Sequence, residues 1–302
     1  MTTPIAWLSE MDFSYGKLEP ITKHVRRLVC PNPSAFTFHG TGTYVIGRER
    51  VMVVDPGPHM PDHIDALLNE LGDERVEAIA ITHTHRDHSP GAALLQARTG
   101  AKTYGYGKHG ERRYKHEGEV EAGADLAFAP DQRLEHGDTL HVGDAQITAV
   151  HTPGHCHNHL CYEVEGENTL LTGDHVMGWS TSVVSPPDGD MGDYLASLRL
   201  LLTRDDKLLV PSHGPPIKEP KPFVQSLLNH RLEREDEIRQ CMHQGILRIT
   251  DMVRHMYRSV PAMLHPAAAR SVLAHMLHMQ KRGEVTCEGP ATVDVVWHLL
   301  EP

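Results

Sequence analysis

The chain has 302 residues, of which 39% are hydrophobic and 23% charged, and its formal net charge is −11. These values are typical of a globular protein with one large domain or a large and a small one, and the acidic balance argues against a generally basic nucleic-acid-binding protein. No apolar run approaches the ~18 residues of a membrane span, so we expect no membrane association. The start, MTTPIAWLSEMDF, lacks the basic and apolar regions of a signal peptide, and the five cysteines are scattered, so we expect a reducing, cytoplasmic location.

Short strands separated by turns dominate the first two-thirds of the chain. Residues 43–47 and 51–55 predict a hairpin, and residues 62–71 carry apolar side chains at helical spacing. Residues 76–82 form an apolar run typical of a buried strand, after which Ser89 and Pro90 predict the N-cap and first turn of a helix. Further strands are predicted at 145–152, 160–164, 169–172 and 208–211, and a helix at 194–202.

The segment 104–125 is rich in Gly, Lys, Arg and Glu and almost free of aliphatic residues. A loop of this length in a compact domain is usually functional or mobile. Its basic residues could meet a phosphate or carboxylate of a substrate. Neighbouring glutamates offset them, however, so we favour a solvated flap with His109 and His116 at the surface. The basic residues are Lys108, Arg112, Arg113 and Lys115.

The proline-rich stretch 211–222 predicts a boundary between a domain of residues 1–220 and a helical domain of residues 221–302. The second part predicts helices at 223–243, 250–257 and 267–281, followed by strands at 284–287 and 293–299. This order suggests a winged-helix unit. It holds 10 Lys and Arg against 9 Asp and Glu, a net charge of +1, which leaves −12 for residues 1–220.

The stretch HTHRDH at 83–88 lies between the buried strand and the helix and concentrates metal-ligating side chains. Side chains two apart at a strand end point the same way, so His83 and His85 can bind one ion. The turn that follows lets Asp87 and His88 face a second point nearby. Imidazole and carboxylate ligands without thiolate suit zinc, with iron or manganese as rivals.

Three further strand ends carry residues of the same kind, each beside Gly or Pro. They are HTPGH at 151–155, TGD at 172–174 and SHG at 212–214. Repeated presentation of metal-binding side chains at strand ends is hard to explain by packing alone, so we expect these stretches to meet at one site.

In order and spacing, these motifs resemble the metallo-β-lactamase superfamily. Carried over position by position, the resemblance implies an α+β, four-layer αββα fold with two metal ions, zinc in the first place. The first metal would be bound by His83, His85 and His155. The second would be bound by Asp87, His88 and His213, with Asp174 bridging. The helix at 194–202, the late histidine and the winged-helix-like unit are similar to the β-lactamase-like protein 2 group, which includes a single-strand-specific endoribonuclease.

Two metal ions that share a water lower its pKa from 15.7 toward about 7 and supply a hydroxide that hydrolyses a carbonyl or phosphoryl centre. Asp87 would orient that hydroxide. His159 would either donate a proton to the leaving group or lie buried behind the site, and the sequence favours neither role. We expect His151, Cys156 and Tyr194 to pack rather than to react.

Three functions stay open. The first is a metal-dependent hydrolase of a (thio)ester-like small or medium substrate. The second is a single-strand-specific endoribonuclease or phosphodiesterase, but RNA binding normally needs a positive track, for which only 104–125 and the nearly neutral C-terminal unit are candidates. The third is a nucleic-acid-binding regulator acting through the C-terminal domain. A near-neutral unit on an acidic body also suggests a homodimer.

Overall fold

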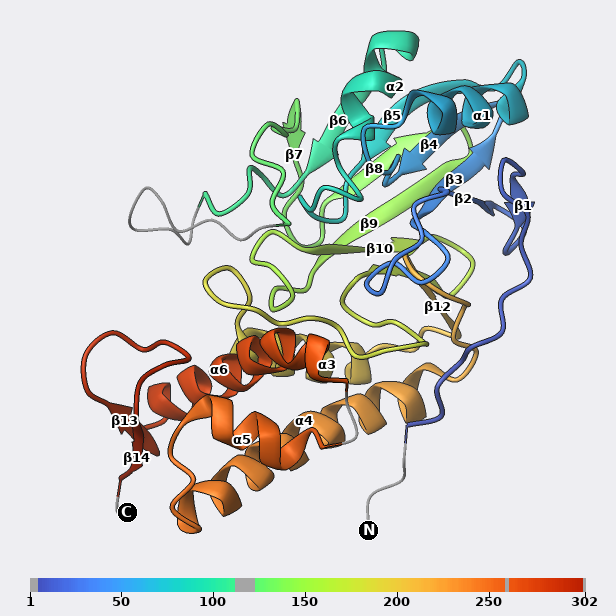
Figure 1. Cartoon of the computed structure of the whole chain (residues 1–302). Helices are drawn as coiled ribbons and strands as arrows, with labels where there is room; N and C mark the ends of the chain where they lie inside the picture. The colour runs from blue at the N-terminus through green and yellow to red at the C-terminus, as the bar shows by residue number, and fades with distance from the viewer. Residues whose placement is uncertain (1–4, 112–122, 259–260, 301–302) are drawn as a thin grey trace.

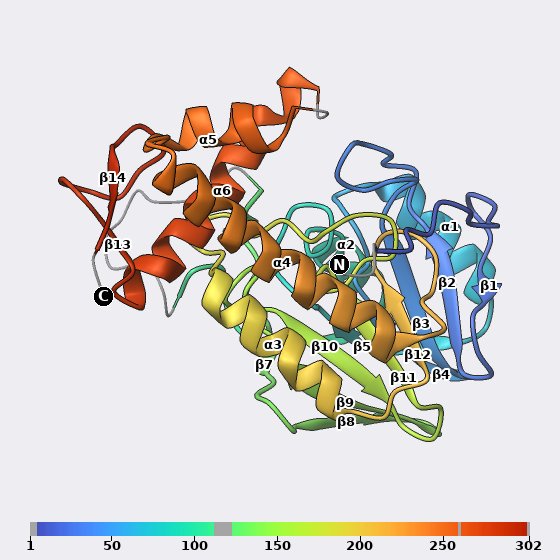
Figure 2. The ribbon, with the colours of Figure 1, turned by 90° about the horizontal axis from the view of Figure 1, so that it is seen from below.

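The computed structural model of the chain describes residues 5–111, 123–258 and 261–300. Two β-sheets pack face to face, and helices cover the outer face of each (Figures 1 and 2). The first sheet follows chain order: β1 (Glu19–Pro20), β2 (Val25–Val29), β3 (Gly42–Arg48), β4 (Arg50–Val54), β5 (Arg75–Ala80), β6 (Lys102–Gly105) and β7 (Gln132–Arg133). The second runs in the order β12 (Leu208–Pro211), β11 (Thr169–Gly173), β10 (Leu160–Val164), β9 (Ala145–His151) and β8 (Thr139–Val142).

The central core lies between the two sheets. Side chains alternate along each strand, because successive residues point to opposite faces. In β3, Tyr44 and Ile46 therefore face the second sheet, whereas Val45 faces outward. Ile147 of β9 and Tyr162 of β10 meet them from the other side of the same core.

The outer faces of the sheets bury apolar side chains under four helices. α1 (Pro61–Leu71) and α2 (Gly91–Thr99) cover the first sheet, and α3 (Met191–Thr203) and α4 (Pro220–His243) cover the second. Asp190 caps α3 by accepting a hydrogen bond from the amide of Asp193. The predicted four-layer αββα fold is thus confirmed. Among the helices of the described ranges, none is long and apolar enough to cross a membrane.

Two local predictions were wrong. Ser89 is not the N-cap of α2, which begins at Gly91, because its hydroxyl contacts the carboxylate of Asp125 instead of a helix amide. His109 is not a surface residue: its ring is buried, and its Nδ1 lies 3.0 Å from the hydroxyl of Thr84. Of the basic residues in this loop, Lys108 is exposed, whereas Arg112, Arg113 and Lys115, like His116, lie outside the described residues.

The C-terminal part forms the predicted winged-helix arrangement. α5 (Ile249–Met256), a short 3-10 turn η1 (Ala262–Leu264) and α6 (His265–Lys281) lead to the hairpin β13 (Val285–Cys287) and β14 (Trp297–Leu299). The long helix α4 joins this part to the rest, because its first half packs with α3 and its second half with α5 and α6. The domain boundary at 220 stays a prediction.

The turn before His155 depends on a glycine. Gly154 adopts φ +138°, and a Cβ there would lie 2.3 Å from Cα of Tyr194 at the start of α3. The loop between β9 and β10 is thereby pressed against the helix at the point where it presents His155. A side chain at position 154 would push the loop, or the helix, away.

We expect Gly154→Ala to lower the free energy of unfolding by roughly 3 kcal/mol, because it adds backbone strain and a clash that no flexible side chain can relieve. Gly137→Ala is the matched control. Gly137 also has positive φ, +89°, but a Cβ there meets nothing within 4 Å, so only the strain of about 1 kcal/mol remains. Chemical denaturation of the metal-free proteins measures both, and equal losses would contradict the steric argument.

Candidate metal centre

Four strand ends meet at one edge of the sandwich. β9 and β11 both run antiparallel to β10, and β12 runs parallel to β11, so the carboxyl ends of β9, β11 and β12 lie at the same edge of the second sheet. The first sheet joins this edge where the amide of Leu160 donates to the carbonyl of Thr82 just beyond β5. The hydroxyl of Tyr162 donates to the carbonyl of Ile81 and ties the same two sheets. The topology therefore brings the four predicted motifs together.

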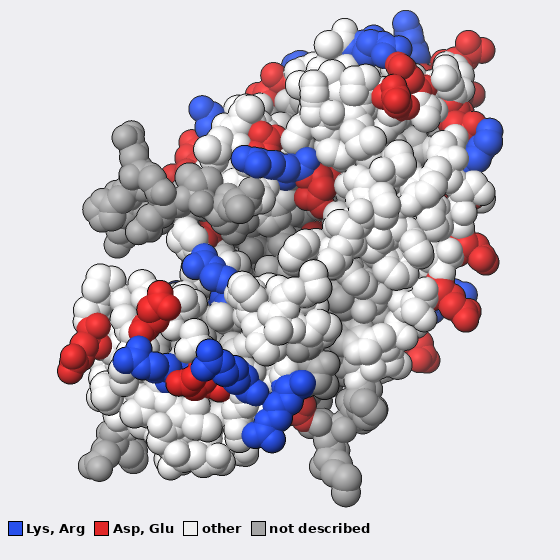
Figure 3. Space-filling view, viewed as in Figure 1, with Lys and Arg blue, Asp and Glu red and all other residues white. Residues whose placement is uncertain are grey.

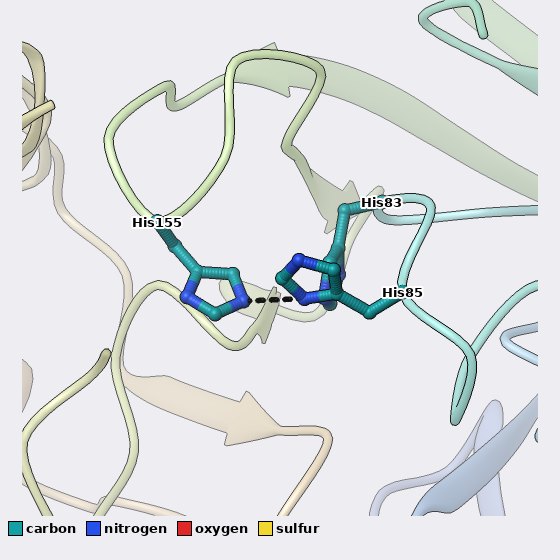
Figure 4. Close-up of side chains that lie close together, drawn as sticks. All are labelled: His83, His85 and His155. Carbon is teal, nitrogen blue, oxygen red and sulfur yellow. Dashed lines mark hydrogen bonds between the residues drawn. The ribbon is translucent and has the colours of Figure 1, made fainter. Parts of the chain in front are cut away.

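Three histidines form the first group. His83 and His85 follow β5, and His155 comes from the loop between β9 and β10; their rings turn toward one another (Figure 4). Nδ1 of His85 lies 3.0 Å from Nε2 of His83 and 2.9 Å from Nε2 of His155. Zinc–nitrogen bonds of 2.0–2.1 Å in a tetrahedral site place ligand nitrogens about 3.3 Å apart, so a small outward movement of the rings would accommodate the ion.

Asp87, His88 and His213 form the second group. Oδ2 of Asp87 lies 3.3 Å from Nε2 of His88 and 3.2 Å from Nε2 of His213. Both imidazole nitrogens are buried and have no hydrogen-bond partner among the described residues, and the same holds for Oδ1 of Asp174. Buried polar atoms that lack partners are costly, and here they converge on one point. Together with Oδ2 of Asp87, these atoms could hold a cation.

Asp174 lies between the two groups. Its Oδ1 is 3.3 Å from Nε2 of His213, and its Oδ2 is 3.8 Å from Nε2 of His155. One carboxylate thus faces both sets of histidines, each with a different oxygen. Such a carboxylate can bridge two ions.

The electrostatics of the site agree with this donor set. Burial alone would raise the pKa of Asp174, but the neighbouring charges of His213 and His88 outweigh it and hold that pKa well below its usual range. Asp87 behaves in the same way, again against burial and through His88 and His213. Burial lowers the pKa of His83 well below its usual value, so its ring is neutral and able to bind a metal. The carboxylates are anionic at neutral pH.

Asp55 supports the second group from beneath, and sequence reasoning missed this role. It lies fully buried just beyond β4 and accepts hydrogen bonds from the amide and the hydroxyl of Thr82, at 2.8 and 2.6 Å. Nδ1 of His88 lies 2.9 Å from Oδ2 of the same carboxylate, and the hydroxyl of Ser212 lies 3.2 Å away. A carboxylate in this position fixes the tautomer of His88 and leaves its Nε2 directed toward Asp87 and Asp174, where it could bind a metal. The sequence feature that could have indicated this role is the position of Asp55 at the end of a predicted strand.

The C-terminal helices hold the segment that orients His155. Nδ1 of His155 lies 2.6 Å from the carbonyl of Val183, so the ring donates there and keeps Nε2 directed at the site. Arg231 of α4 donates to the neighbouring carbonyl of Ser182, and Lys281 of α6 pairs with Asp190 at the end of the segment. The winged-helix part therefore contributes to the geometry of the metal centre without supplying a ligand.

His159, the predicted proton donor, lies fully buried behind the site. Its Nδ1 is 2.9 Å from the hydroxyl of Thr152, and its Nε2 accepts a hydrogen bond from the amide of Asp174 at 3.2 Å. A Cβ on Gly173 would come within 2.5 Å of Nε2. These are the contacts of a residue that positions the turn carrying Asp174, and the catalytic role stays a prediction.

Three other residues belong to neither group. The ring of His151 stacks on Tyr106 with centroids 4.2 Å apart, and its Nε2 lies 2.9 Å from the carbonyl of His157. Cys156 is buried. Tyr194 is buried in the core under α3 and donates to the carbonyl of His175. All three pack, as predicted.

Comparison with known proteins gives consistent matches. Residues 37–213 match the metallo-beta-lactamase superfamily, and residues 249–291 match the beta-lactamase associated winged helix domain. The chain is 32% identical over 290 residues to the beta-lactamase-like protein 2 homolog of Drosophila melanogaster, covering 93% of this chain and 96% of the relative. It is 30% identical over 225 residues to the atrochrysone carboxyl ACP thioesterase of Aspergillus terreus, covering 73% and 64%.

Solved structures agree on the fold. A beta-lactamase domain protein from Burkholderia ambifaria superposes with a TM-score of 0.80 at 20% identity, covering 96% of each chain. A metallo-beta-lactamase family protein from Thermus thermophilus gives 0.75 at 20% identity, covering 93% of this chain and 100% of that one. The two-part architecture thus recurs as a whole.

We expect Asp55→Asn to weaken binding of the second ion by about 10- to 100-fold, because the side chain that orients His88 loses its charge and one acceptor. Isothermal titration of zinc into the metal-free protein measures this. Asp131→Asn is the control: Asp131 also accepts from the amide and hydroxyl of a threonine, Thr103, but belongs to neither group. Two ions bound with unchanged affinity in Asp55→Asn would contradict the assigned support.

Metal binding is expected to release protons at pH 7. Burial lowers the pKa of His213, but the nearby carboxylates of Asp174 and Asp87 outweigh it and raise that pKa to about 9 in the metal-free protein. Below pH 9 this imidazole is therefore protonated, whereas a metal ligand must be neutral. Zinc binding therefore displaces a proton below pH 9, and the affinity for zinc rises with pH up to about 9. Calorimetry in buffers of different ionisation enthalpy measures the release, and heats independent of buffer would contradict it.

Proposed function

Because the chain belongs to the metallo-beta-lactamase superfamily, we propose that it is a binuclear zinc-dependent hydrolase of a (thio)ester-like small or medium substrate. The observation that carries the proposal is the carboxylate of Asp174 between two histidine groups, with buried atoms that lack partners around it. The imidazole and carboxylate ligands of the two groups suit zinc, and iron or manganese are the alternatives that metal analysis distinguishes.

Zinc ions held by these residues would lower the pKa of a bound water toward about 7 and so would supply a nucleophile at neutral pH. We propose that Asp87 orients that nucleophile. Its side chain is 30% exposed, whereas those of His88 and His213 are 0% and 1% exposed. Because the pKa of the Asp87 carboxyl group is held low, this side chain is ionised at neutral pH and accepts hydrogen bonds. His159 steadies the turn of Asp174 from behind, through the amide of that residue.

The relatives favour a thioester over a nucleic acid. A relative 30% identical over 225 residues is named as a carboxyl acyl-carrier-protein thioesterase. Hydrolysis of a thioester needs attack on one carbonyl carbon and departure of a thiolate. The leaving group is a weak base, so it needs little help from a proton donor. Both ring nitrogens of His159 are already hydrogen-bonded within the protein, so this histidine is not needed as a proton donor for such a leaving group.

An endoribonuclease is the second candidate, favoured by the winged-helix part. Such an enzyme would need cations free to meet phosphates. Arginines of the C-terminal part are instead paired with carboxylates: Arg239 lies 2.8 Å from Glu284, Arg254 lies 2.8 Å from Asp251, and Arg282 lies 2.6 Å from Glu284. On the face drawn in Figure 3, Lys and Arg over the C-terminal helices alternate with Asp and Glu. This pattern also weighs against a nucleic-acid-binding regulator.

The test is metal analysis combined with a hydrolase panel that compares acyl-thioesters with single-stranded RNA. We expect two zinc ions per chain and thioester hydrolysis with little salt dependence. His88→Ala should lower kcat/KM by at least about 100-fold, because it removes a ligand of the second ion. His151→Ala is the control, a strand-end histidine that lies outside both groups.

Thioesterase activity that survives His88→Ala unchanged would contradict the binuclear assignment. Cleavage of RNA that falls steeply with salt, without thioester hydrolysis, would establish the second candidate instead.

A further inference from the structure

The N-terminal segment runs along the beginning of α4 (Figures 1 and 2). A cavity of about 990 Å³ opens between them. Residues 6–12, the loop 215–219 after His213 and the first turns of α4 form its walls. The metal ligands do not line it. Its volume lies at the upper end of the range for small-molecule sites, about 300–1,000 Å³.

The walls are largely apolar. Trp7 and Phe223 meet edge to face with ring centroids 6.3 Å apart, and Ile21 and Ile217 extend the same surface. Trp7 is 44% exposed, which leaves an indole face available in the cavity. Such a surface suits a hydrocarbon chain.

One of the charged residues that line the cavity is buried. Arg27 of β2 lines the cavity and is only 3% exposed. Its contacts are with neutral groups: Nη1 lies 3.5 Å from the carbonyl of Gly214, Nη2 lies 3.3 Å from the carbonyl of Asp12, and the guanidinium faces the hydroxyl of Tyr44. Its Nε has no hydrogen-bond partner, and no carboxylate of the described residues pairs with it.

The preceding residue, Arg26, has the carboxylate partner that Arg27 lacks among the described residues. Arg26 points to the opposite face of the strand and lies 2.7 Å from a carboxylate oxygen of Glu74. A buried guanidinium without a counter-ion is costly, and its planar fork fits a carboxylate with two parallel hydrogen bonds. The structure therefore presents a buried cation, at the wall of an apolar cavity, whose partner is not supplied by the described chain.

The rim selects among anions. Glu10, Asp12 and Glu219 are exposed there, against a single exposed cation, Lys218. Three carboxylates at the mouth repel a polyanion such as a nucleotide or RNA, whereas a single charge can pass and reach Arg27. We propose that this cavity binds an amphipathic monocarboxylate, with its carboxylate on Arg27 and its hydrocarbon chain along Trp7 and Phe223. The site is separate from the metal centre and does not depend on the proposed hydrolase activity.

The test is isothermal titration of decanoate and of decanol into the zinc-loaded protein. Decanoate should bind, and decanol should bind about 10- to 100-fold more weakly, because it cannot pair with the guanidinium. Arg27→Met should lower decanoate affinity by a similar factor and leave decanol unchanged. The Tm of this variant, measured alongside, shows whether it folds like the parent. Arg27→Lys should restore part of the affinity.

Two further variants complete the test. Arg48→Met is the control, an exposed arginine of the neighbouring strand β3, and should bind decanoate like the parent. Ser226→Trp fills the cavity from α4 and should abolish binding of both decanoate and decanol. This variant tests the cavity even if the Arg27 variants fold poorly.

Three results would each overturn the proposal. They are no binding of decanoate to the parent, equal affinities for decanoate and decanol, and decanoate affinity that is unchanged in Arg27→Met. The last is also the outcome expected if decanoate binds at the zinc ions.

Discussion

Two carboxylates and five imidazoles share one small space, and the rest of the fold keeps them there. Buried carboxylates and imidazoles that face one another without full hydrogen bonding are unstable unless a cation or protons lie between them. In the metal-free protein, the raised pKa of His88 and His213 provides the protons. Metal ions would replace those protons with fixed charge. Asp174 is the residue on which both groups depend, because each of its oxygens faces a different set of histidines.

The support of this space is distributed over the whole chain. Asp55 fixes His88 from the first sheet, and the carbonyl of Gly40 lies 3.3 Å from Nδ1 of His213. The carbonyl of Val183 orients His155, and the segment around it is in turn held by Arg231 of α4. The C-terminal helices are thus part of the structural basis of the site. A winged-helix fold in this position needs no nucleic acid to explain its presence.

The ligands could be predicted from sequence because they occur in short motifs at strand ends, where local pattern and chemistry coincide. The strands β3 to β5 and the helices α1 and α3 were predicted for a similar reason, since their apolar periodicity is regular. The features that the sequence did not predict depend on contacts between residues that are far apart in the chain. Asp55 binds Ser212, 157 residues away in the chain, so no local pattern shows its role. Arg27 likewise has no local sequence feature that indicates its burial, because its contact with the carbonyl of Gly214 spans 187 residues of the chain.

The central claim is that these residues bind two ions on either side of Asp174. The most direct measurement is anomalous diffraction at the zinc edge from crystals grown with excess zinc. The account predicts two peaks about 3.5–4 Å apart. One should be bound by His83, His85 and His155, the other by Asp87, His88 and His213. A single peak in such crystals, or none, would contradict it.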